Sequence, residues 1–148
     1  MNARPRLRYI ELLTGHDHDG PAWIAFVQAS KSGARLYFNG KALARLEGSR
    51  HYDVETRETY WASGVKKDGR DRHRTGSGKV AIEKSAIPSY LRFIGATELD
   101  ASRFVVIDDL PATDVIRFHT IANQPMSAEA YEAALKEATP VTRKVRAP

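Results

Sequence analysis

The residues with the clearest potential for binding chemistry lie in a basic, glycine-rich stretch, 66–79. Its cations are Lys66, Lys67, Arg70, Arg72, Arg74 and Lys79. Such side chains neutralise phosphates, and glycines let backbone N–H groups approach a phosphate oxygen. Tyr60 and Trp61 precede the stretch, and aromatic rings of this kind stack on nucleic-acid bases. The pattern predicts a nucleic-acid-binding surface, and the alternative is a solvated loop whose cations pair with Asp68, Asp71 and nearby carboxylates.

A His-Asp-His-Asp run at 16–19 has the residue types of a metal site. Two imidazoles beside carboxylates suit Zn, Ni or Fe(II). The run lies in a turn-rich segment and has no third ligand at a fixed spacing. We therefore predict a surface turn here, and no metal.

Groups suited to acid–base catalysis are also present. Asp108 and Asp109 lie at the end of a predicted strand, and His73 and His119 are candidate general bases. The nucleophile motif G-x-S-x-G is absent, and 76–79 lacks the spacing and hydroxyl of a phosphate-binding P-loop. The sequence predicts no catalytic residue and no cofactor. A small hydrolase or metal-dependent enzyme is the third-ranked reading.

Composition limits the class of protein. The chain has 148 residues, a formal net charge of +5 and no cysteine. Disulfides, zinc–thiolate sites, iron–sulfur clusters and thiol nucleophiles are thereby excluded, and the positive charge favours polyanions as partners. The basic N-terminal segment is followed by apolar runs too short for a signal sequence, and no stretch approaches a membrane span. We expect a cytoplasmic protein with no membrane partner.

Short strands separated by turn residues dominate the first part of the chain. Alternation of apolar and polar residues predicts strands at 7–13, 22–29, 35–38, 51–55, 59–65 and 79–83. Turns are predicted at 30–33 and at Asn39-Gly40, and a surface loop at 66–78. Residues 41–46 are compatible with a strand or a helical turn. Trp23 is predicted to lie in the core.

The later segments mix helix and strand. A helix is predicted after 83, with Ser85 as N-cap, Pro88 in its first turn and Gly95 ending it. A strand at 103–108 and a loop at 108–114 follow. Residues 115–121 are compatible with a strand or a helix, and their β-branched side chains favour the strand. A helix at 127–138 and a disordered basic tail at 139–148 are predicted for the rest of the chain.

These elements predict a mostly β, α+β fold. The short strands favour a small curved antiparallel sheet or an SH3/OB-like barrel with a C-terminal strand–helix extension. The predicted units are a β-rich core domain at 1–95, a strand–helix extension packed on it at 96–138, and the tail at 139–148.

Several segments of the chain resemble a family of short bacterial proteins of unknown function. They include Gly-Pro-Ala-Trp-Ile at 20–24, Ser-Lys-Ser-Gly at 30–33 and Tyr-Phe-Asn-Gly-Lys-Ala-Leu at 37–43. The resemblance covers about 9–95. It continues in Tyr-Asp-Val-Glu-Thr at 52–56, Tyr60-Trp61, the Ser-Gly-Val-Lys-Lys run at 63–67, Gly69 and Asp-Arg-His at 71–73. The resemblance implies a self-contained unit and no particular activity. Arg57 stands where the glycine of a tighter turn is expected.

The sequence favours a non-enzymatic module that binds DNA or RNA through Lys66, Lys67, Arg70, Arg72, Arg74 and Lys79, with Tyr60 and Trp61 nearby. Contacts to phosphate give little sequence preference. The alternative is a protein-interaction or accessory subunit, of an antitoxin or immunity type. It would use a sheet edge or the helix predicted at 127–138.

Overall fold

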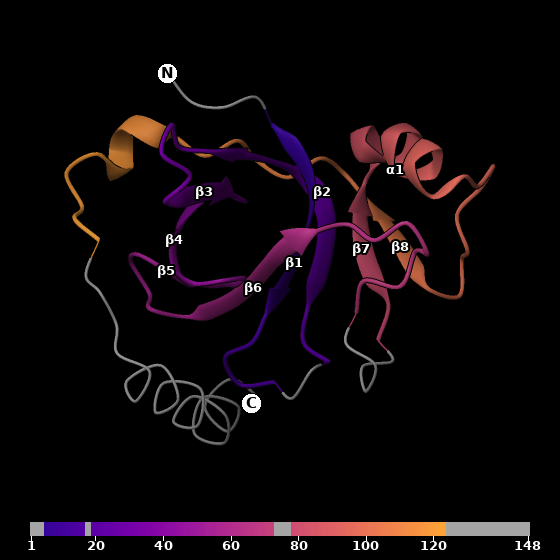
Figure 1. Cartoon of the computed structure of the whole chain (residues 1–148), viewed down its shortest axis with the longest axis horizontal. Coiled ribbons are helices and arrows are strands. Elements are labelled where there is room, and N and C mark those ends of the chain that lie inside the picture. Colours follow the sequence, from indigo (N-terminus) through magenta and orange to yellow (C-terminus); the bar gives the residue numbers. More distant parts are fainter. Residues whose placement is uncertain (1–4, 17–18, 73–77, 124–148) are drawn as a thin grey trace.

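Six antiparallel strands close into a small barrel in the computed structural model, which describes residues 5–16, 19–72 and 78–123 (Figure 1). The strands are β1 (Arg6–Leu12), β2 (Ala22–Ala29), β3 (Arg35–Phe38), β4 (Lys41–Glu47), β5 (Arg50–Asp53) and β6 (Thr59–Gly64). Each pairs with its neighbour along the chain, and β1 pairs with both β2 and β6. The second pairing of β1 closes the ring. The fold is the mostly β, SH3/OB-like α+β barrel that the sequence predicts.

Alternate residues of the six strands fill the barrel. Successive side chains of a strand point to opposite faces, so one set from each strand meets in the lumen. The lumen set comprises Ile10, Ala25, Val27, Leu36, Phe38, Leu43, Tyr60 and Ala62. Trp23 packs against this set, with its ring 5.3 Å from that of Phe38 in an edge-on arrangement. Trp23, predicted to lie in the core, is thus half-buried and packs against it.

Strand β2 continues the sheet beyond the barrel. Its first half pairs in parallel with β7 (Val80–Glu83), whereas its last residues pair with β3 on the same edge. Strand β8 (Phe104–Ile107) adds in parallel to β7. The 3-10 turn η1 (Lys84–Ala86) and helix α1 (Ile87–Ile94) follow β7 (Figure 1). Tyr90 of α1 packs with outward-facing residues of β1, β2, β7 and β8. A second core therefore lies outside the barrel.

Most of the predicted strands are present, and residues 41–46, left open, lie within β4. Asn39 and Gly40 both have positive φ, as a tight hairpin turn requires. Gly95 ends α1 with a φ of 74°, as predicted. The N-cap prediction is wrong. Ala86 occupies that position without a side-chain hydrogen bond, because η1 leads directly into the helix.

At 115–121, the preference for a strand over a helix is also wrong. The first residues of this segment form a second 3-10 turn, η2 (Val115–Phe118), and Phe118 is fully buried against Tyr37 and Ala42. At position 57, where a glycine was expected, Arg57 has a φ of 67°, and its guanidinium lies 4.8 Å from the centre of the Tyr52 ring.

The helix predicted at 127–138 and the tail at 139–148 lie outside the described residues. Among the helices that are described, none is long and apolar enough to cross a membrane.

Candidate nucleic-acid interface

Arg72 is held inside the structure instead of facing solvent. Its side chain is 9% exposed and donates to the backbone oxygens of Gly20, at 2.9 Å, and Lys79, at 3.2 Å. The guanidinium lies 3.5 Å from the Asp19 carboxylate and 4.0 Å from that of Glu11. Arg72 thus joins the start of β7 to the end of the 13–21 loop, and its role in the structure is to stabilise the fold.

Glu11 explains why a cation is needed there. It lies on the outward face of β1, is fully buried, and accepts a 2.5 Å hydrogen bond from the Tyr9 hydroxyl. Burial and this carboxylate raise the pKa of Tyr9 above its usual range. A buried carboxylate is costly without an opposite charge, and Arg72 supplies it.

In the described part of the predicted phosphate loop, 66–72 and 78–79, three backbone N–H groups are already hydrogen-bonded to carboxylates. The N–H groups of Lys66, Arg70 and Gly78 donate to the carboxylates of Asp71, Asp68 and Asp19. Gly69 is buried, and Arg103 donates to its carbonyl oxygen. Burial also raises the pKa of Asp71. These N–H groups are therefore not directed at a ligand.

The two predicted aromatic contacts differ in position. Tyr60 is 3% exposed, lies in the lumen set, and has its pKa raised by burial. Its ring cannot stack on a base in this conformation. Trp61 is half-buried on the outward face, where its Nε1 donates to Ser63 Oγ at 3.2 Å.

The remaining predicted cations are exposed but lie apart. Lys66 and Lys67 follow the end of β6, and Lys79 precedes β7. The register places the end of β6 beside the start of β1, whereas β7 begins beside the start of β2, at the opposite end of the barrel. The loop thus runs from one barrel end to the other. Arg70 is exposed between them, and Arg74 lies outside the described residues.

The structure gathers a different set of cations at one barrel end. The start of β1, the β2–β3 turn, the β4–β5 hairpin and the end of β6 all meet there. We call their basic residues the basic rim: Arg6, Arg8, Lys31, Arg45, Arg50, Lys66 and Lys67. Glu47 is the sole carboxylate within 6–8, 30–34, 45–50 and 64–67. Only the two lysines of β6's end belong to the loop singled out in the sequence.

The opposite barrel end has a different charge pattern. Lys41 lies 3.6 Å from the Asp53 carboxylate, and Arg117 forms a 2.5 Å ion pair with Glu55. Glu58 is in the same β5–β6 turn. Lys41 and Arg117 at this end are thus paired with carboxylates, and the charge pattern differs between the two ends of the barrel.

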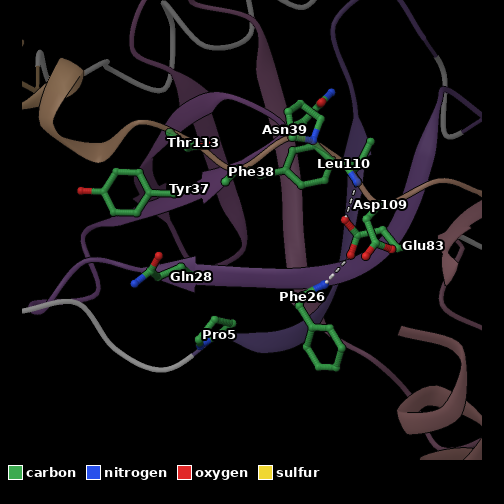
Figure 2. Close-up of a pocket in the computed structure, with 12 residues that line it drawn as sticks. Pro5, Phe26, Gln28, Tyr37, Phe38, Asn39, Glu83, Asp109, Leu110 and Thr113 are labelled. Atoms are coloured by element: carbon green, nitrogen blue, oxygen red, sulfur yellow. Dashed lines mark hydrogen bonds between the residues drawn. The ribbon is translucent and has the colours of Figure 1, made fainter. Parts of the chain in front are cut away.

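A groove of about 250 Å³ opens on the barrel wall where β7 and β3 diverge from β2 (Figure 2). The buried Glu83 accepts from the backbone N–H groups of Phe26, at 3.2 Å, and Leu110, at 2.8 Å. The Glu83 carboxylate thus links Leu110, in segment 109–113, to β2 at the place where β7 and β3 separate. The groove is lined by aromatic rings, side-chain amides and the carboxyl groups of Glu83 and Asp109, so its chemistry does not suit phosphate.

The other groupings noted in the sequence have structural positions. Asp109 Oδ1 accepts from the backbone N–H of Ser85, and Asp108 forms a 3.0 Å ion pair with Lys84. His119 is exposed. His73 and residues 17–18 lie outside the described segments. Within those segments, no three His, Cys, Asp or Glu residues are arranged to hold a metal ion.

Comparisons with known proteins found no matching family model, curated protein or solved structure.

Proposed function

We propose that this protein binds nucleic acid through the basic rim, with contacts mainly to phosphate. The observation that supports this most strongly is the polarised barrel: the four segments that meet at one end, 6–8, 30–34, 45–50 and 64–67, have seven cations and one carboxylate, with Asp71 of the adjoining loop beside Lys66. Clustered arginine and lysine side chains attract the phosphate backbone irrespective of base sequence. Compared with the sequence-based prediction, the interface keeps Lys66 and Lys67 and assigns Arg72 and Tyr60 to stabilising the fold.

The proposal predicts a steep and local salt dependence. A rim variant carries K31Q, R45Q, K66Q and K67Q, four exposed positions where the change leaves packing intact. Each phosphate contact on a single strand contributes roughly 0.7 to the slope of log K against log salt, so four lost contacts lower it by roughly 3. Fluorescence anisotropy of a labelled mixed-sequence oligonucleotide over a salt series measures both slopes.

The matched control removes four exposed cations elsewhere: K79Q, K84Q, R92Q and R117Q. It has the same net charge as the rim variant and is expected to keep most of the wild-type slope. Equal losses in the two variants would show attraction to overall charge, and the rim proposal would fail. It would also fail if the wild-type protein bound no oligonucleotide near physiological salt.

A specific feature favours protein interaction as the second candidate function. Within the described part of the chain, β8 pairs only with β7, so its other edge is open. Val105 and Val106 of this strand are 47% and 48% exposed. An open strand edge with exposed β-branched side chains can accept a strand from a partner. Binding there would be much less sensitive to salt than binding to phosphate.

A further inference from the structure

At the basic rim, a histidine and two arginines face the barrel lumen. His51 of β5 is the cross-strand partner of Arg45 on β4 and of Tyr60 on β6. Cross-strand partners project on the same face of a sheet. Because Tyr60 belongs to the lumen set, His51 and Arg45 point to the lumen side as well. His51 is only 5% exposed, whereas Arg45 is exposed at the mouth.

Arg8 reaches the same mouth from β1. Its cross-strand partner on β2 is Ala25, a member of the lumen set, so Arg8 also faces inward. Its partner on β6 is Gly64, which has no side chain, and a Cβ added there would meet no atom within 4 Å. The mouth is therefore open beside the half-buried Arg8.

Among the described residues, no ion pair joins the arginines of this cluster to a carboxylate. In the described chain, neither Arg8 nor Arg45 forms an ion pair. The charged and titratable groups facing His51 are Arg45 of β4, Tyr60 of β6, Arg8 of β1 and, two residues along its own strand, Asp53. The Asp53 carboxylate is directed away, since it accepts from the backbone N–H groups of the next turn and lies near Lys41.

The protonation of His51 depends on the charges around it. Its Nδ1 lies 2.9 Å from the Ser49 carbonyl oxygen, so Nδ1 carries the proton and Nε2 is the second site. Burial and then the fields of Arg45 and Arg8 lower the pKa of His51, although the bond to Ser49 opposes this. An anion placed between the arginines offsets their field and so favours the protonated form of His51.

We propose that Arg8, Arg45 and His51 together bind one phosphate group at the mouth of the barrel. This inference rests on the proposed function when the phosphate belongs to a nucleic acid, and free inorganic phosphate has the same chemistry. The guanidinium groups are suited to oxyanions because they offer paired N–H donors. His51 takes a proton from solvent at Nε2 as the phosphate binds, and then donates to it. The site thus binds phosphate more tightly as pH falls.

The test is an NMR titration of the assigned His51 ring against pH, with and without inorganic phosphate. We expect phosphate to raise the pKa of His51 by about one unit, which corresponds to a tenfold difference in phosphate affinity between the two protonation states. R45Q should weaken phosphate binding about tenfold. H51Q should keep weaker binding, and its remaining dependence on pH should be that of the ionisation of phosphate itself. An unchanged His51 titration in saturating phosphate would overturn the proposal.

Oligonucleotides distinguish the sources of the phosphate. If 5′-phosphorylated strands shift His51 and 5′-hydroxyl strands of the same sequence do not, the site takes a terminal phosphate. Equal shifts indicate a backbone phosphate. Oligonucleotide binding with no response at His51 would refute this site and leave the proposed function standing. A response to inorganic phosphate without oligonucleotide binding would support the site and refute the function.

Discussion

We predict that the Glu83 carboxylate contributes strongly to the free energy of unfolding, because it lies where the barrel meets β7 and β8. It is 6% exposed and accepts from two backbone N–H groups, those of Phe26 and Leu110. Phe26 lies on β2 between the residues paired with β7 and those paired with β3. The N–H of Phe26 therefore has no carbonyl acceptor from a paired strand on that edge, and the Glu83 carboxylate accepts its hydrogen bond instead.

Glu83→Ala leaves both N–H groups without an acceptor in a part-buried position beside the groove. An unsatisfied buried polar group costs about 1–3 kcal/mol. Because both donors are near the half-buried groove, the sum should be about 2–4 kcal/mol. For a domain of this size that lowers Tm by roughly 8–15 °C. Glu83→Gln retains one acceptor oxygen and should fall between the wild type and Glu83→Ala.

Urea unfolding of the three proteins measures these differences in free energy. The matched control is Asp109→Asn, an exposed neighbour whose carboxylate accepts only from the Ser85 N–H, and its cost should stay below about 1 kcal/mol. If Glu83→Ala were as stable as the wild type to within about 0.5 kcal/mol, the assignment of Glu83 as the replacement acceptor would be refuted.

Two further predictions concern Arg72 and β8. Arg72→Met should lower the free energy of unfolding in urea by about 2–4 kcal/mol, because Glu11 stays buried and loses this counter-charge, and adding Glu11→Gln should recover part of the loss. A loss no larger than that of the exposed control Arg70→Gln would refute this role of Arg72. Val106→Lys puts a charge on the open edge of β8, so proteins that bind by strand addition should no longer co-purify, while the affinity for oligonucleotides stays unchanged. An undiminished set of co-purifying proteins would refute β8 as the site of protein binding.

Local pattern was enough to predict most strands, because alternating apolar residues and turn chemistry act over a few positions. The β3–β4 hairpin shows this: Asn39-Gly40 has the positive φ values of a tight turn, which also settles 41–46 as its return strand. At 115–121 the β-branched residues pointed to a strand. Val115, Phe118 and Ile121 recur every third residue and pack on Tyr37 and Ala42, the spacing of a 3-10 turn.

Closure of the barrel and the interface depend on non-local pairing. No local signal shows that β1 pairs with both β2 and β6, or that Arg8 and Arg45 face one lumen. The charge-dense loop drew attention in the sequence, yet Arg72 is used internally and several loop N–H groups are bonded to carboxylates. One usable signal exists: alternate turns of an antiparallel meander lie at the same end, and the turns at 30–34 and 45–50 contain cations.

The central claim, that one end of the barrel is the nucleic-acid face, is tested most directly by mapping amide chemical shifts during titration with a mixed-sequence oligonucleotide. The account predicts the largest changes at 6–8, 30–34, 45–50 and 64–67, with little change in the β5–β6 turn at the opposite end. Changes centred on that turn, on the groove near Phe26, or spread evenly over the surface would contradict it.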